Sequence, residues 1–502
     1  MQKPPIVTGS MISRAVAGLD RAIFAFLALF ALALPLSIKG AERSWKIALV
    51  LWLVKLLIER ARPVPQPLTA PLLAFVSLSA ISTILSPEPY LSWDRMKIVC
   101  LVLAGIVVAQ NIKRLSQARW LVSLLVFSAF VAALFTGWQY THGIGVRVQQ
   151  LSPSSRLAVR GVRRDAILIS IAGHSVNTPG EVERIIAAVP GRKAVPIKYL
   201  PYLGTRQETA FATADDFLQS GLGTPEMQLT LGKPYRAQGT LGHYVVFAEM
   251  LMQVGCLAWA LLFSADRRRW APMLCAAVAF FSITAALFAT ETRAAVAGLA
   301  IGCLLQLSLI SAGKRRWWAV VGLVLIVAGA TVWFQHTRGL RWIDRNDVGA
   351  QFRLLMWEDG LRLVRQHPWF GVGMETVRVH WLEWNIRGFI RYHVLSHFHS
   401  TYLQIAVERG VPALLAWLWF CVAYSVFLTR LSLRLRGQNR FALATATGIY
   451  AGFVAFAFTS FVHYNLGEEP LVMLLFFGMG IVVALDRITS EQADSTTDPA
   501  TS

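Results

Sequence analysis

Long apolar runs, separated by polar connections, follow one another along most of the chain. A helix needs about 20 mainly apolar residues to cross the hydrocarbon core of a membrane. Twelve runs approach that length, at residues 20–38, 45–59, 68–86, 94–111, 119–141, 240–264, 270–290, 294–312, 316–335, 411–430, 441–463 and 467–486. This pattern predicts an all-α polytopic membrane protein with about twelve transmembrane helices.

The same pattern divides the chain into six regions. Helices one to five fall within residues 1–141, helices six to nine within 239–335, and helices ten to twelve within 411–487. Two long polar loops, at 142–238 and 336–410, lie between these groups. Residues 488–502 are nearly free of hydrophobic side chains, which predicts a disordered tail.

Basic residues predict the orientation of the helices, because Lys and Arg collect in cytoplasmic loops. They recur in alternate connections: Arg60 and Arg62; Lys113, Arg114 and Arg119; Arg267, Arg268 and Arg269; Lys314, Arg315 and Arg316; and Arg430, Arg434, Arg436 and Arg440. Both termini and the tail are therefore expected in the cytoplasm. The two long loops are then expected on the outer side.

Composition supports a membrane protein. The chain is 55% hydrophobic and only 15% charged, whereas soluble domains average about 25% charged residues. Lys and Arg outnumber Asp and Glu by 48 to 28. These basic residues are scattered between apolar runs and form no soluble basic domain, so we expect no nucleic-acid partner.

The first outer loop contains signals for a small α+β module at about residues 156–201. An alternating stretch, DAILISIAGHSV, turns at Gly173 and predicts a strand. Thr178, Pro179 and Glu181 then form a helix-start signature, and AVPIKYL follows as a second strand. This order resembles the second half of a bacterial periplasmic PDZ domain. Since the upstream stretch 151–161 does not match a carboxylate-binding loop, we expect a spacer or a docking site for a protein partner.

Two arginines precede or separate predicted spans on the outer side. Arg236 lies just before the sixth span, and Arg293 lies between the seventh and eighth. A guanidinium offers a planar fork of donors that can grip a phosphate with two hydrogen bonds. Snorkelling toward lipid headgroups is the alternative explanation for either arginine alone.

The end of the second loop is rich in histidine. His393, His397 and His399 lie near Glu375 and Glu383 in sequence, which leaves a metal site open as one interpretation. No HExxH or similar metal motif accompanies them. A single histidine that accepts a proton near neutral pH is the second interpretation, and a purely structural histidine is the third.

Several motifs in this half of the chain resemble one family. His399 and Ser400, followed by nine residues and Gly410, match the H-[N/S]-x9-G signature of the O-antigen ligase and O-antigen polymerase superfamily, which includes bacterial O-linking oligosaccharyltransferases. RAQGTLGHY around Arg236, TETRAAVAGL around Arg293, FRLLMWEDGL around Arg353 and HPWFGVG at 367–373 stand in the family's order. Thr292, Tyr244-Val245 and the PDZ-like insertion depart from the usual pattern.

The resemblance implies a metal-independent, inverting glycosyltransferase that needs no cofactor. It would move a glycan from a polyprenyl (undecaprenyl) pyrophosphate carrier to an acceptor hydroxyl on the periplasmic side of a bacterial inner membrane. His399 would take the acceptor proton, and Arg236, Arg293 and Arg353 would bind the donor pyrophosphate. His397 and Ser400 are candidates for orienting His399.

The acceptor distinguishes the members of this superfamily. Lipid A-core is the expected acceptor, as in O-antigen ligation during lipopolysaccharide biosynthesis. Two alternative acceptors are a second glycan, as in a polymerase, and a protein hydroxyl, as in an oligosaccharyltransferase. The PDZ-like insertion favours the protein acceptor. A twelve-helix secondary transporter or a membrane scaffold would belong to different classes, although transporters usually carry ionisable residues at mid-membrane.

Overall fold

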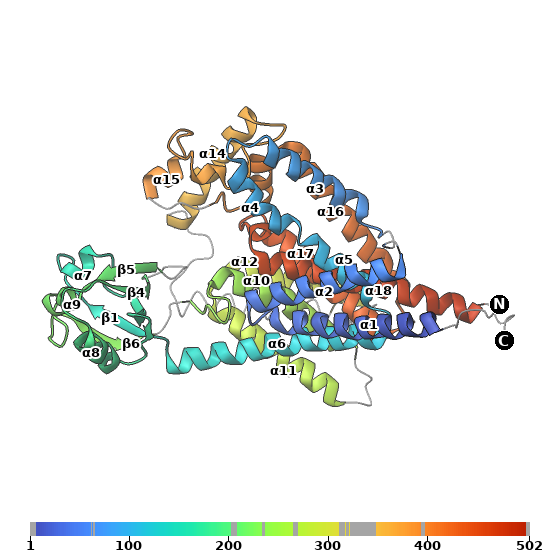
Figure 1. Cartoon of the computed structure of the whole chain (residues 1–502), viewed down its shortest axis with the longest axis horizontal. Helices are drawn as coiled ribbons and strands as arrows, with labels where there is room; N and C mark the ends of the chain where they lie inside the picture. Colours follow the sequence, from blue (N-terminus) through green and yellow to red (C-terminus); the bar gives the residue numbers. More distant parts are fainter. Residues whose placement is uncertain are drawn as a thin grey trace. The chain divides into compact units, whose positions relative to one another are not determined.

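The computed structural model describes residues 7–61, 63, 66–201, 208–232, 236–264, 270–310, 317, 321, 348–392 and 397–497. The chain forms two compact units. The first contains residues 1–129, 249–281 and 293–502, and the second contains residues 130–248 and 282–292. Figure 1 shows the elements of both, coloured along the sequence.

Eight helices in the described part of the chain are long and apolar enough to cross a membrane. They belong to α1 (Val7–Ala33), α6 (Leu115–His142), α10 (Tyr244–Leu261), α11 (Trp270–Ala289), α12 (Arg293–Ile310), α16 (Thr401–Arg434), α17 (Arg440–Thr459) and α18 (Glu469–Thr497). Each corresponds to one of the twelve predicted runs. The polytopic membrane architecture is therefore supported, while the number twelve is not confirmed.

The other four predicted spans differ for separate reasons. α2 (Ile38–Glu59) includes the charged residues Lys39, Glu42, Arg43, Lys46, Lys55 and Glu59, and α3 (Thr69–Ile84) has only 16 residues. The run at 94–111 is two short helices, α4 (Pro89–Val99) and α5 (Val102–Asn111), with a break at residues 100 and 101. The run at 316–335 lies almost entirely outside the described residues.

Packing in the first unit joins helices that are distant in sequence. α1 lies against α2, α5 against α18, α3 against α16, and α12 against α17. Aromatic rings fill two of the buried regions: Phe30 meets Phe477 edge-on at 5.5 Å between centroids, and Phe75 lies 5.2 Å from Trp417. Because lipid tails are as apolar as these side chains, such close contacts rather than hydrophobicity hold membrane helices together.

Part of the second unit is a six-stranded antiparallel sheet with the strand order β5-β4-β2-β1-β6, and β3 pairs with β2. Its strands are β1 (Val146–Gln150), β2 (Ile167–Ile171), β3 (His174–Ser175), β4 (Val195–Leu200), β5 (Glu208–Ala212) and β6 (Gln228–Leu231). Three helices accompany them: α7 (Arg156–Val159), α8 (Pro179–Ala188) and α9 (Ala214–Gln219).

The predicted strand, helix and strand of this module are confirmed. α8 begins with the expected capping box of Thr178 and Glu181, with Pro179 in its first turn. Its Val182 and Ile186 are buried in the core of the sheet. The module extends beyond the expected residues 156–201, because β1, β5 and β6 add strands on both sides. Its kinship with PDZ domains stays a prediction.

The second long loop builds a small apolar core of its own. α14 (Val348–Gln366), the 3-10 turn η1 (Thr376–Arg378) and α15 (Arg387–Tyr392) contribute to it. Its buried side chains are Met356, Leu363, Val372, Val377, Ile386, Phe389, Phe398 and Val407. α14 ends at Gln366, directly before His367 and Pro368.

The predicted disordered tail is wrong over most of its length. α18 continues as helix to Thr497, so residues 488–497 are helical. Arg434 explains part of this extension, because its guanidinium bonds to Thr489 at 3.0 Å and to Ser490 at 2.8 Å. Residues 498–502 lie outside the described part of the chain.

Candidate active site

His399 directly precedes the first residues of α16. Ser400 is the N-cap of that helix: its side chain accepts a hydrogen bond from the Leu403 N–H at 3.4 Å. His399 itself has φ +50°, in the left-handed region that residues other than glycine adopt rarely and at a cost. Strained backbone of this kind is common at functional sites.

The ring of His399 is packed among aromatic side chains and charges. Its centroid lies 4.3 Å from that of His397 and 5.4 Å from that of Phe352. The His399 backbone N–H donates to Nδ1 of His397 at 3.0 Å. Burial, together with the nearby charge of Arg353 and the proximity of His463, lowers the pKa of His399 to about 3. His399 is therefore neutral at neutral pH.

Arg353 reaches this site from α14, which packs against α16. The two helices approach closely at Gly360, where a β-carbon would lie 2.8 Å from Leu403 and 3.0 Å from Phe398. Because Gly360 and Arg353 are seven residues apart, they lie two turns apart on one face of α14. The packing of α14 on α16 thus accounts for the proximity of Arg353 to His399.

Gly410 interrupts α16 ten residues after Ser400. It has φ +84°, and a β-carbon there would overlap with the carbonyl group of Trp369 and lie 2.7 Å from the Phe370 nitrogen. The Val411 N–H donates to the Pro368 carbonyl at 2.7 Å. Two family motifs, HPWFGVG and the glycine after His399-Ser400, therefore meet in space.

Further backbone bonds join the same two segments. The Val372 N–H donates to Val407 at 2.9 Å, and the Gly373 N–H donates to Glu408 at 2.8 Å. The segment that follows α14 is thereby fixed to the first turns of α16. This explains why a fixed spacing separates His399 from Gly410.

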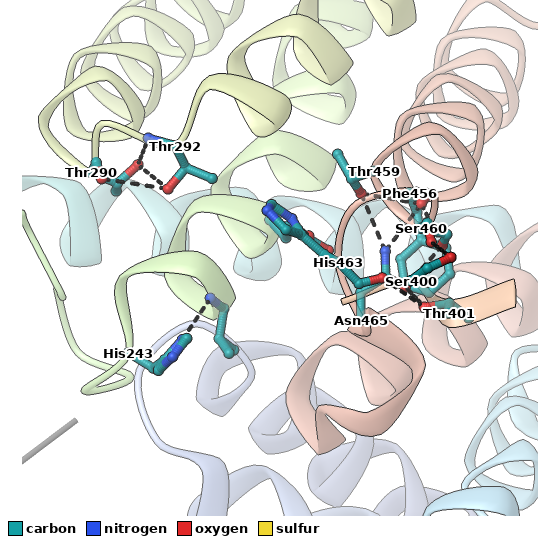
Figure 2. Close-up of polar contacts among 12 residues, drawn as sticks. His243, Thr290, Thr292, Ser400, Thr401, Phe456, Thr459, Ser460, His463 and Asn465 are labelled. Carbon is teal, nitrogen blue, oxygen red and sulfur yellow. Dashed lines mark hydrogen bonds and ion pairs between the residues drawn. The ribbon is translucent and has the colours of Figure 1, made fainter. Parts of the chain in front are cut away.

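A buried polar network holds the start of α16 to the connection between α17 and α18 (Figure 2). Thr401 donates from its backbone N–H to the Ser460 carbonyl at 2.8 Å and from its hydroxyl to the side-chain Oδ1 of Asn465 at 2.7 Å. Asn465 also accepts from the Ser460 hydroxyl at 2.8 Å and donates to the Phe456 carbonyl at 3.0 Å. The network keeps Ser400 and His399 at a defined position.

A second buried cluster was not expected from the sequence. Glu408 accepts hydrogen bonds from the Glu375 N–H at 3.0 Å, from Gln404 at 2.8 Å and from Tyr464 at 3.3 Å. The guanidinium of Arg409 lies over the ring of Phe75 at 5.3 Å. The proximity of the Glu408 carboxylate, after burial itself, raises the pKa of Tyr464.

Sequence reasoning also missed the pair formed by Glu249 and His463. Nδ1 of His463 lies 2.5 Å from a carboxylate oxygen of Glu249, although 214 positions separate the two residues. Each was hidden inside or at the end of a predicted apolar run, at 240–264 and 441–463. Only two signals were available in the sequence. One is a single acid, Glu249, within an apolar run, and the other is the polar sequence HYN at the end of a second apolar run.

Arg293 is the first residue of α12 and belongs to the same unit as His399. α12 lies antiparallel to α17: a β-carbon on Gly298 would contact Ala455 and Thr459, and one on Gly302 would contact Ala451. At 1.5 Å per residue, continuing this register from Gly298 to Arg293 leads just past Thr459. Arg293 is thus expected at the level of the α17–α18 connection.

Arg236 belongs to the second unit. Its guanidinium carbon lies over the ring of Tyr244 at 4.7 Å, and Nε is 3.9 Å from the buried carboxylate of Glu291. The Ala237 N–H donates to the Ala289 carbonyl at 3.0 Å, which fixes this segment to the end of α11. Glu291 is therefore an anionic neighbour of Arg236 within the protein itself.

The residues named for a metal site make other contacts. Glu375 pairs with Arg95 at 3.1 Å and with Arg378 at 3.0 Å. Glu383 lies 2.7 Å from His380, and His393 lies outside the described residues. Within the part of the chain that the structure describes, no three His, Cys, Asp or Glu side chains gather as a metal site.

A family model described as O-antigen ligase matches residues 277–418. The matched region includes Arg293, Arg353, His397, His399 and Gly410, and it ends inside α16. No curated protein matches the chain. The match supports glycan transfer of the O-antigen ligase or polymerase type at a membrane.

Proposed function

We propose that this chain, whose match supports the O-antigen ligase superfamily, transfers a glycan from undecaprenyl pyrophosphate to a hydroxyl of lipid A-core. The reaction takes place on the periplasmic face of a bacterial inner membrane, in lipopolysaccharide biosynthesis. Both chain termini lie in the cytoplasm in this proposal. It extends the family match in donor, acceptor and orientation.

The observation that carries the proposal is the neighbourhood of His399 and Arg353. A neutral imidazole can accept a proton, and a nearby guanidinium can bind the phosphate of the leaving group. In the absence of donor, Arg353 helps to lower the pKa of His399 to about 3. A bound pyrophosphate would offset the charge of Arg353 and raise the proton affinity of His399 when the donor arrives.

In the proposed step, the acceptor oxygen attacks the anomeric carbon of the glycan. The bond from that carbon to the pyrophosphate oxygen breaks, and the leaving oxygen keeps the electron pair. The hydroxyl proton passes to His399. A single displacement of this kind inverts the anomeric configuration and forms no glycan bound to the enzyme. The step balances without a metal ion or a cofactor.

Arg293 and Arg236 complete the donor site in this proposal. Negative charge grows on the pyrophosphate as the bond breaks, and preorganised guanidinium groups stabilise it without reorganising. The start of α12 adds the partial positive charge of a helix N-terminus beside Arg293. His397 and Ser400 orient His399, since one bonds to its backbone and the other caps the helix that follows.

Transfer to a protein hydroxyl is the second candidate. The sheet of the second unit has β5 and β6 at its two edges. An edge strand can bind an extended segment of another protein by adding it to the sheet. A docking site for a protein acceptor would suit an O-linking oligosaccharyltransferase.

A competition assay with purified protein tests both candidates. A defined lipid-linked glycan is offered together with lipid A-core, a free glycan and a serine-containing protein, and the products are separated by mass. We expect lipid A-core to receive the glycan and His399→Ala to abolish transfer. Full activity of His399→Ala would refute the catalytic assignment, whereas glycosylated protein as the main product would replace the preferred acceptor.

A further inference from the structure

His463 lies in the connection between α17 and α18, beside the start of α16. Its carbonyl oxygen accepts hydrogen bonds from the backbone N–H and the hydroxyl of Thr401, each at 3.0 Å. Its own N–H donates to the Thr459 carbonyl at 2.9 Å. The backbone of His463 is thus fixed from two sides. One of these contacts is to Thr401, which follows His399 by two positions in the sequence (Figure 2).

Glu249, from α10, holds the ring of His463. One carboxylate oxygen lies 2.5 Å from Nδ1, the Glu249 side chain is fully buried, and the His463 side chain keeps 15% of its surface exposed. A carboxylate bonded to an imidazole fixes the proton on the facing nitrogen and stabilises the imidazolium. With Nδ1 facing the Glu249 carboxylate, Nε2 is the ring nitrogen left to receive a proton.

The two histidines differ in the charge that surrounds them. Arg353 and His463 both lower the pKa of His399, in addition to burial. An imidazole in that environment can pass on a proton but is poorly suited to keep it. His463 has a buried carboxylate on its ring and is close enough to His399 for their charges to interact.

We propose that His463, held by Glu249, retains the proton that the acceptor hydroxyl releases. The inference rests on the proposed glycan transfer. The acceptor oxygen bonds to the anomeric carbon, the pyrophosphate oxygen leaves with the electron pair, and the hydroxyl proton passes through His399 to Nε2 of His463. The Glu249 carboxylate balances the resulting charge. Glu249 and His463 act through His399 and are positioning residues.

Four charged or titratable residues lie around His463. Glu249 comes from α10 and His399 from the segment before α16. Arg353 acts on His399 from α14. Glu408 is linked to the neighbouring Tyr464 by a 3.3 Å hydrogen bond. Among these groups, only Glu249 is hydrogen-bonded to the His463 ring.

The test measures kcat/KM for lipid-linked glycan transfer by the full-length protein from about pH 5 to about pH 9. Glu249→Gln should lower the plateau on the order of 10²-fold and move the acidic limb to lower pH, because His463 loses the charge that favours its protonation. His463→Ala should lower the plateau similarly, and added imidazole should restore part of the rate. Tyr402→Phe is the matched control, since its hydroxyl donates to the Ala457 carbonyl of α17 at 2.8 Å.

Three outcomes would overturn the inference while His399→Ala remains inactive. The first is that Glu249→Gln and His463→Ala both keep the wild-type rate and pH profile. The second is that the rate falls while the acidic limb of the kcat/KM profile stays at the same pH. The third is that added imidazole does not restore the rate of His463→Ala. If Glu249→Gln fails to fold by thermal unfolding, His463→Gln replaces it under the same criteria. An active His399→Ala would instead refute the proposed function itself.

Discussion

Gly410 and Trp369 approach so closely that a β-carbon on the glycine would overlap with the tryptophan carbonyl. Gly410 also has φ +84°. This contact joins Gly410, the last residue of the signature that begins at His399, to the HPWFGVG segment. The two segments reach the active site only if this contact forms.

Gly410→Ala is therefore expected to destabilise the protein and to abolish transfer. Left-handed backbone costs an alanine about 1–2 kcal/mol, and the overlap with Trp369 should raise the total to about 3 kcal/mol or more. Gly437→Ala is the control, because Gly437 has φ +78° with nothing within 4 Å of its β-carbon position. Thermal unfolding in detergent measures both, and equal losses would show that backbone strain alone explains the effect.

Arg293→Lys and Arg236→Lys are each expected to reduce transfer at least about tenfold, because an ammonium cannot reproduce a two-pronged guanidinium contact. The loss should fall mainly on kcat/KM for the lipid-linked donor. Arg147→Lys is the control: Arg147 makes two hydrogen bonds to one carboxylate oxygen of Asp165, at 2.6 and 3.0 Å, within the sheet. Unimpaired donor kinetics in Arg293→Lys would remove Arg293 from the donor site.

His399 should make the stability of the protein depend on pH. Its folded pKa, about 3, is below the ordinary 6.5. The unfolded chain therefore binds a proton between these values that the folded chain does not, so stability falls as pH decreases below about 6.5. His399→Gln should show a smaller decrease in melting temperature between about pH 7 and about pH 5. Identical pH dependence in both proteins would contradict a buried, neutral His399.

Apolar periodicity was sufficient for the helices whose interiors carry few charges, such as α6 and α17, and local helix-start signals were sufficient for α8. Apolar periodicity failed to separate α4 from α5, because hydropathy records composition and does not detect a break at Cys100 and Leu101. It failed at the tail as well, where Arg434 contacts Thr489 and Ser490 on α18.

The candidate site divides in a similar way. His399, Arg353 and Gly410 were identified by motifs that lie within about sixty residues of one another. Glu249 could not be identified, because its partner His463 is 214 positions away and each residue alone is unremarkable in sequence. The contact exists only because α10 lies beside the connection between α17 and α18, and no local pattern records that.

The anchorage of α16 gives the last prediction. The Thr401 hydroxyl donates to the His463 carbonyl at 3.0 Å and to Asn465 at 2.7 Å, so it links the segment of His399 to that of His463. Thr401→Val keeps the shape and removes both bonds, which should cost about 1–3 kcal/mol of stability and reduce kcat more than KM changes. Thr447→Val is the control, because the hydroxyl of the buried Thr447 donates to carbonyls of its own helix, those of Leu443 and Ala444. If both variants lose the same activity, loss of a buried hydroxyl explains the result, and the link between the two histidine segments has no separate role in transfer.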